Sequence, residues 1–349
     1  MPTNYAAILN PVDLARLERL RSAAGVGPIV ILTHDNPDPD ALASGMALAF
    51  LFKELWEIPS ELIYTGLVAR AENRAVLKIL TPGWRQEESV PDLNCFSAVV
   101  LVDSQPTSGN NRLPEGVTPE IVIDHHLPRE EALRQVRYVD VRPELGATVS
   151  LVYQYLDAAG IVPDATLSTA MFYGLQTDTR GLARDASPTD EMIYMQLVGL
   201  MDRKKLVMVE QAGLSRDYFL AFNRGLEAAR LYGRCVIANL GEIHRPDLPA
   251  EMADVLIRLE SAQAVLCFGT FDDQMHLSLR TEPAGQDAGQ LVQQVIASLG
   301  KAGGHGTMAG GQISLAGWNS RRLGDVIEQR FLRIMEETGP GAPLLKKNH

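Results

Sequence analysis

The chain has 349 residues, of which 46% are hydrophobic, and carries a formal net charge of -11. These values are typical of a globular protein with one large or two smaller domains, and the acidic balance argues against a sequence-independent track for long DNA or RNA. The three cysteines lie far apart without a C-x-x-C pair, so we expect neither a thiolate metal site nor a disulfide framework, which fits a cytoplasmic protein. The longest apolar helical run, at 45–52, ends at Lys53, short of the ~20 residues that span a bilayer, so neither export nor membrane insertion is expected.

The first half of the chain alternates apolar runs with helical patterns. Near the N-terminus, Leu14, Leu17 and Leu20 recur at the spacing of an amphipathic helix. The predicted strands are 29–33, 61–66, 98–104 and 120–126, and the predicted helices between them include 40–56 and 70–80. This alternation predicts an α/β fold with a largely parallel sheet. From 145 to 230 the sequence predicts helices almost throughout.

From residue 231 the pattern restarts and predicts a second, smaller α/β domain. A strand at 233–241 precedes a helix at 248–261, and a hairpin turns at Asp272 and Asp273. A helix at 289–300 then leads to a glycine-rich turn and a further strand. The expected organisation is a first domain over 1–205, a helical linker over 206–230, a second domain over 231–338 and a flexible tail over 339–349.

Acidic side chains lie where several predicted elements of the first domain end or begin. These are Asp38, Asp40, Asp103, Asp124 and Asp178. A lone Asp at the start of a helix is a common N-cap, so Asp40 by itself has a purely structural interpretation. The carboxyl ends of parallel strands, however, meet at one edge of a sheet, where ligands bind. Clustered carboxylates repel one another unless cations compensate them, so bound metal is the simplest explanation of the set.

Histidines accompany these carboxylates at His34, His125 and His126. A set of imidazole and carboxylate ligands without thiolate favours Mn²⁺ or a similar first-row ion over Mg²⁺. Two such ions lower the pKa of a shared water and clamp a phosphoryl oxygen, which is the arrangement for phosphoester hydrolysis. The sequence therefore predicts a metal-dependent phosphoesterase.

Four short motifs resemble those of the DHH phosphoesterase family, in order and at similar spacing. They are His34-x-Asn36-Pro37-Asp38-x-Asp40, the isolated Asp103, the triplet Asp124-His125-His126, and Asp178 in GLQTDTRG. The resemblance implies a two-metal centre. One ion would be held by His34, Asp38 and Asp103. The other would be held by Asp40, Asp103, His125 and Asp178, with Asp103 bridging.

The resemblance also assigns roles beside the metal ligands. Asp124 would orient an imidazole, and His126 would face the substrate phosphate. The catalytic residues that it implies are Asp103, Asp124, His125 and His126.

In the second domain, GGHGTMAGG at 303–311 resembles the family's glycine-rich loop around a histidine. A glycine-rich loop is by itself more often only a turn. Together with the metal motifs it implies substrate binding by Gly303, Gly304 and His305, and the resemblance adds Arg280, whose planar guanidinium suits a phosphate. The loop departs from the common three-glycine form at Ala302 and Met308.

The size and layout of the chain resemble the nanoRNase type within the family, which implies hydrolysis of short RNA oligonucleotides or linear dinucleotides to 5'-mononucleotides, and of 3'-phosphoadenosine 5'-phosphate. The alternatives are a cyclic dinucleotide phosphodiesterase, a RecJ-type single-strand exonuclease and a non-catalytic nucleotide sensor. A family II inorganic pyrophosphatase shares the metal motifs but uses an SRKK-like signature, which is absent after residue 231. A homodimer is left open by the sequence.

Overall fold

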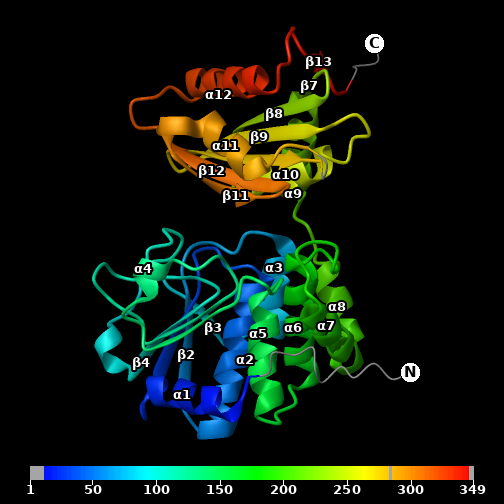
Figure 1. Ribbon diagram of the computed structural model, residues 1–349. Helices are drawn as coiled ribbons and strands as arrows, with labels where there is room; N and C mark the ends of the chain where they lie inside the picture. The colour runs from blue at the N-terminus through cyan, green and yellow to red at the C-terminus, as the bar shows by residue number, and fades with distance from the viewer. Residues whose placement is uncertain (1–11, 283–284, 346–349) are drawn as a thin grey trace. The chain divides into compact units, whose positions relative to one another are not determined.

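The computed structural model describes residues 12–282 and 285–345. The chain divides into two compact units, Met1–Ala212 and Gly213–His349 (Figure 1). Each unit contains a β-sheet and helices, so the predicted α/β fold class is confirmed. No helix of the described ranges is long and apolar enough to cross a membrane.

The sheet of the first unit has six strands, all parallel, in the order β3-β2-β1-β4-β5-β6. The strands are β1 (Ile29–Leu32), β2 (Ser60–Tyr64), β3 (Trp84–Gln86), β4 (Ala98–Val102), β5 (Ile121–Asp124) and β6 (Tyr138–Val141). The chain moves outward from β1 in one direction to β3, then returns to place β4 on the other side of β1. At such a reversal of strand order, the loops after the two central strands separate and leave room for a ligand.

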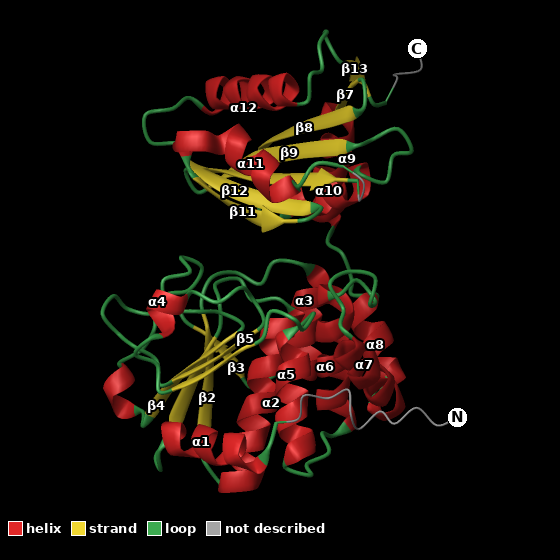
Figure 2. Cartoon of the chain, viewed as in Figure 1, coloured by secondary structure: helices red, strands yellow, loops and turns green. Residues whose placement is uncertain are grey.

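Helices and loops bury this sheet on both faces, as the apolar sequences of the central strands predict (Figure 2). Ile29 and Ile31 pack in the larger core cluster with α2 (Pro39–Trp56) and α5 (Thr148–Ala158), while Val30 and Leu32 pack on the opposite face. The remaining helical elements of the unit are α1 (Leu14–Ala24), α3 (Ala71–Ala75), the π-helical η2 (Val76–Leu80), η3 (Leu93–Cys95), α4 (Glu130–Leu133), α6 (Ala165–Asp178), α7 (Pro188–Leu200) and α8 (Arg203–Glu210).

The second unit has a seven-stranded sheet in the order β11-β12-β10-β9-β8-β7-β13. Only β8 and β9 pair in parallel. The strands are β7 (Arg230–Tyr232), β8 (Cys235–Glu242), β9 (Ala264–Phe271), β10 (Gln274–Thr281), β11 (Lys301–His305), β12 (Met308–Ser314) and β13 (Ala342–Pro343). One face packs against α11 (Ala288–Ile296), η4 (Ala297–Leu299) and α12 (Ser320–Ile334), and the other against α9 (Arg216–Ala228) and α10 (Leu248–Leu256).

Several elements differ from the sequence predictions. The segment 206–230 is not one linker helix, because α8 ends at Glu210 and α9 begins at Arg216. The glycine-rich segment is not a simple turn but the β11–β12 hairpin. Strands β3 and β6 and helix α12 were not predicted, and within the expected tail β13 pairs with β7. Residues 346–349 of that tail lie outside the described ranges.

Candidate metal centre

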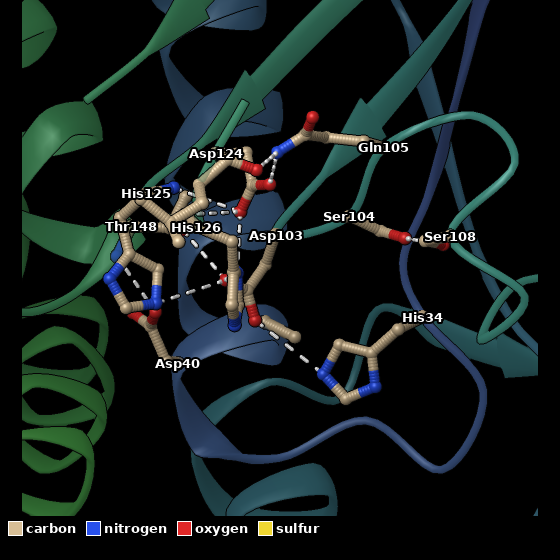
Figure 3. Close-up of polar contacts among 12 residues, drawn as sticks. His34, Asp40, Asp103, Ser104, Gln105, Ser108, Asp124, His125, His126 and Thr148 are labelled. Carbon is tan, nitrogen blue, oxygen red and sulfur yellow. Dashed lines mark hydrogen bonds and ion pairs between the residues drawn. The ribbon is translucent and has the colours of Figure 1, made fainter. Parts of the chain in front are cut away.

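The acidic and histidine motifs of the first unit meet at the carboxyl edge of its sheet. His34 lies in the loop between β1 and α2, Asp103 follows β4 directly, and Asp124 is the last residue of β5. Helix α6 contributes Asp178, its last residue. Since β1 and β4 are neighbours at the reversal of strand order, their following loops place His34 beside Asp103 (Figure 3).

The start of α2 supplies two carboxylates with different local roles. Asp38 is the N-cap, and its side chain accepts a hydrogen bond from the N–H of Ala41. Asp40 lies in the first helical turn and is only 1% exposed. The structural interpretation of Asp40 as the N-cap is therefore wrong, because the cap is Asp38, two residues earlier. Asp40 does not cap the helix, and its buried carboxylate instead accepts hydrogen bonds from the N–H groups of Thr148 and Val149.

Two candidate ligand groups share Asp103. In the first group, His34 Nε2 lies 3.5 Å from Asp103 Oδ2 and 4.0 Å from Asp38 Oδ1. In the second, His125 Nε2 lies 3.7 Å from Asp103 Oδ1 and 3.2 Å from Asp178 Oδ2. The two carboxylate oxygens of Asp103 therefore face different imidazoles.

The ligand atoms in each of three sets lie within 4.8 Å of one another. These sets are His34, Asp38 and Asp103; Asp40, His125 and Asp178; and Asp103, His125 and His126. Every residue that the sequence proposed as a metal ligand belongs to at least one of the first two sets.

Asp124 contacts the imidazole of His126 instead of joining these groups. Its Oδ1 is 2.8 Å from His126 Nδ1 and also accepts a hydrogen bond from the N–H of His125. Its Oδ2 accepts a hydrogen bond of 2.6 Å from Gln105 Nε2. Asp124 thus contacts a histidine ring from a buried position, whereas the side chain of His126 is 54% exposed.

Burial and the neighbouring carboxylates shift the pKa values in this cluster. For His34, burial alone would lower the pKa, but the hydrogen bond to Asp103 and the charge of Asp38 raise it to about 10. Burial likewise opposes the hydrogen bond to Asp178 and the charge of Asp103, which together raise the pKa of His125 to about 11. Burial and the charges of Asp103 and Asp178 raise the pKa of Asp40 well above its usual value.

This donor set fits divalent cations. Asp40 and Asp103 are 1% and 2% exposed, and burying two carboxylates this close together requires compensating positive charge. Carboxylate and imidazole donors without thiolate suit Mn²⁺ and related first-row ions.

The sequence analysis did not identify two residues that hydrogen-bond the acidic side chains of this centre, Thr148 and Gln105. The hydroxyl of Thr148 donates a hydrogen bond of 2.7 Å to Asp103 Oδ1. Gln105 holds Asp124 and also accepts a hydrogen bond from the N–H of Arg129, which ties the loop after β5 to the loop after β4. Gln105 was detectable as a polar residue two positions after Asp103, whereas Thr148 gives no signal beyond a hydroxyl at the start of a helix.

In the second unit, Arg280 on β10 is 6% exposed and firmly held. Its Nε donates a hydrogen bond of 2.6 Å to Asp254 Oδ1, and its Nη1 donates one of 2.7 Å to Ser278 Oγ. Within 12–282 and 285–345, Nη2 makes no hydrogen bond. That atom is the part of the guanidinium that a phosphate could contact.

The glycine-rich residues lie on the β11–β12 hairpin. Gly303 is exposed and has nothing within 4 Å of where a Cβ would stand. Gly304, with φ of 141°, instead packs closely on Ala309, so its lack of a side chain is required by the hairpin itself. His305 lies in β11, but its side chain is outside what the structure describes.

Comparison with known proteins identifies relatives of both units. The sequence model of the DHH family, N-terminal domain, matches residues 28–180, and that of the DHHA1 domain matches residues 233–331. An uncharacterized protein of Methanocaldococcus jannaschii is 34% identical over 321 residues, which cover 91% of this chain and 64% of that protein. A probable manganese-dependent inorganic pyrophosphatase of Streptococcus agalactiae is 26% identical over 151 residues, 43% of this chain and 48% of that protein. The chain spans less than two thirds of the length of either relative.

Two solved structures share the fold. An exopolyphosphatase-related protein from Bacteroides fragilis matches with a TM-score of 0.72 and 16% identity, over 94% of this chain and 99% of that one. RecJ from Thermus thermophilus in complex with Mn²⁺ matches with a TM-score of 0.57 and 15% identity, over 93% of this chain and 55% of that one. At such identities the likeness concerns the fold alone.

Proposed function

Since the chain belongs to the DHH family and carries a DHHA1 domain after its DHH domain, we propose that it is a metal-dependent hydrolase of phosphodiester or phosphomonoester bonds in small nucleotides. The observation that carries this proposal is the position of Asp103 between two ligand groups, with one oxygen 3.5 Å from His34 and the other 3.7 Å from His125. A carboxylate shared in this way is what a two-metal phosphoesterase requires.

Under this proposal, two divalent ions occupy the two groups, with Mn²⁺ as the native metal. His34, Asp38 and Asp103 would hold one ion, and Asp40, Asp103, His125 and Asp178 the other. When bound, such ions supply a nucleophile from water at neutral pH and positive charge for the phosphoryl oxygens.

The chain's other residues would hold and orient the substrate. Asp124 keeps a proton on His126 Nδ1, at 2.8 Å, which fixes the ring and leaves Nε2 to meet a phosphate oxygen. We assign Arg280, through its Nη2, to a substrate phosphate, because Asp254 and Ser278 already hold the rest of the guanidinium in place. Gly303, Gly304 and His305 are proposed as further substrate contacts in the DHHA1 domain.

The preferred substrates are proposed to be RNA of two to five nucleotides and linear dinucleotides, with 5'-mononucleotides as products, and 3'-phosphoadenosine 5'-phosphate as a further substrate. This rests on the resemblance to the nanoRNase type and on the net charge of -11. An acidic chain offers few cations for additional phosphates, so extra substrate length adds repulsion and little affinity.

The test is turnover by the full chain with Mn²⁺ on RNA of two, five and twenty nucleotides, a cyclic dinucleotide, 3'-phosphoadenosine 5'-phosphate and inorganic pyrophosphate. We expect kcat/KM to be highest for the two- and five-nucleotide RNAs and at least about tenfold lower for the twenty-nucleotide RNA. Equal values for two and twenty nucleotides would instead indicate a RecJ-type exonuclease. Preference for the cyclic dinucleotide or pyrophosphate would reassign the substrate, and binding without any turnover would indicate a nucleotide sensor.

A further inference from the structure

The first residue of α5, Thr148, contacts two of the candidate metal ligands at once. Its hydroxyl donates a hydrogen bond of 2.7 Å to Asp103 Oδ1, and its backbone N–H donates one of 2.7 Å to Asp40 Oδ2 (Figure 3). The N–H of Val149 donates a third, of 2.8 Å, to Asp40 Oδ1. The start of one helix therefore holds carboxylates that come from α2 and from the end of β4.

These contacts fall on one side of the centre. Thr148 bonds the oxygen of Asp103 that faces His125, not the oxygen that faces His34. Asp40 belongs to the set with His125 and Asp178. Among the described residues, no hydrogen bond joins Thr148 to His34 or Asp38. The start of α5 thus contacts the second ligand group through Asp40 and through the Asp103 oxygen that faces His125.

The backbone at Asp103 explains why the carboxylate of this residue needs a hydrogen bond to orient it. Asp103 has a φ of 56°, so the chain turns sharply at the residue that serves both groups. The hydroxyl of Thr148, a residue that is 0% exposed, holds Asp103 by Oδ1, the oxygen on the side of His125. Asp40 is stabilised in the same way, because the first N–H groups of a helix are unpaired within it and favour a negative charge.

We propose that Thr148 is a positioning residue for the second metal group, setting the affinity of Asp40, Asp103, His125 and Asp178 for a divalent cation and affecting the His34 group much less. The inference rests on the proposed function, because it requires a metal to bind at the second group. It adds that hydrogen bonds from the start of α5 orient the ligands of the second group more than those of the His34 group. Loss of a hydrogen bond that orients a metal ligand weakens metal affinity by about 10–100-fold.

The experiment measures Mn²⁺ binding to the full chain, from the electron paramagnetic resonance signal of free Mn²⁺, which requires no substrate. Thr148→Val removes the hydroxyl at nearly constant shape, and Thr148→Ser restores it. Two backgrounds separate the sites: His34→Ala removes a ligand of the first group only, and Asp40→Asn removes one of the second only. Thr169→Val is the matched control, since Thr169 is also a buried helical threonine, and its hydroxyl donates to the Ala165 carbonyl and accepts from the Asp202 N–H, neither of them a metal-ligand candidate.

In the His34→Ala background, we expect Thr148→Val to weaken Mn²⁺ binding by about 10–100-fold and Thr148→Ser by less than about threefold. In the Asp40→Asn background, Thr148→Val should leave the affinity within about threefold. The inference is overturned if Thr148→Val has no effect in the first background, if both backgrounds lose affinity equally, or if Thr169→Val has the same effect. If the wild-type chain binds no Mn²⁺, the proposed function itself is overturned. That measurement needs no variant, so the two failures are distinguishable.

Discussion

Asp103 shows how much of the centre depends on a single residue. It is 2% exposed, accepts a hydrogen bond from Thr148, and adopts a left-handed backbone conformation with φ of 56°. Asp and Asn tolerate that conformation better than most residues, because their short polar side chains bond locally. A substitution that tests the charge of Asp103 must therefore keep this backbone.

Asp103→Asn meets that condition and removes only the negative charge. We expect the bound Mn²⁺ to fall and turnover on a dinucleotide to drop by about a thousandfold or more, because both ligand groups lose their shared carboxylate. Metal content by atomic emission and steady-state kinetics measure the two effects. Asp157→Asn, at an exposed position on α5, is the control and should behave as wild type. Full metal content with near-normal turnover in Asp103→Asn would rule out the bridging role.

At the scale of elements, two adjacent glycines of the β11–β12 hairpin, Gly303 and Gly304, have different surroundings. Gly304 lies against Ala309 and the Met308 carbonyl, and the N-terminus of α11 packs on the same hairpin through the Ala288 N–H, which donates to the Gly306 carbonyl at 2.7 Å. Gly303 meets nothing within 4 Å. Of these two glycines, it is therefore Gly303 whose missing side chain leaves space for a ligand without being required by the fold.

This difference predicts opposite results for two adjacent substitutions. Gly304→Ala should lower the free energy of unfolding by about 2–4 kcal/mol, since the new Cβ overlaps backbone at an unfavourable φ. Gly303→Ala should change it by less than about 0.5 kcal/mol, yet lower kcat/KM on a dinucleotide by about tenfold if a substrate phosphate approaches this backbone. Chemical denaturation and steady-state kinetics give both values. Unchanged kcat/KM in Gly303→Ala would remove Gly303 from the substrate contacts.

The same elements show what the sequence could predict. Strands β1, β4 and β5 are buried on both faces and stand out as continuous apolar runs, and the ligand motifs follow from their ends. The edge strands β3 and β6 were missed because edges carry polar residues, such as Asp140, which is 7% exposed and pairs with Arg142 at 2.9 Å and with Arg16 at 3.3 Å. Helix α12 was missed although its buried residues recur every four positions. Contacts such as that of Thr148 join distant segments and leave no local pattern.

For the whole molecule, the candidate functions divide between the two units. All the metal-ligand candidates belong to the first unit, whereas Arg280 and the glycine-rich hairpin belong to the second. Each unit has its own buried core clusters. Metal binding should therefore be separable from substrate binding by cutting the chain between the units.

A fragment of residues 1–212 tests this separation, because the boundary between Ala212 and Gly213 lies between α8 and α9. Circular dichroism with a cooperative thermal transition must first establish that the fragment folds. We then expect it to bind Mn²⁺ with the affinity of the full chain, since it retains every ligand candidate, and to lose about ten- to hundredfold or more in kcat/KM on dinucleotides, because it lacks the charged hydrogen bond that we propose for Arg280. The same fragment with Asp103→Asn should bind Mn²⁺ weakly, which controls for adventitious metal. If the folded fragment binds no Mn²⁺, the ligand set is wrong; if it turns over dinucleotides as fast as the full chain, the DHHA1 domain does not hold the substrate.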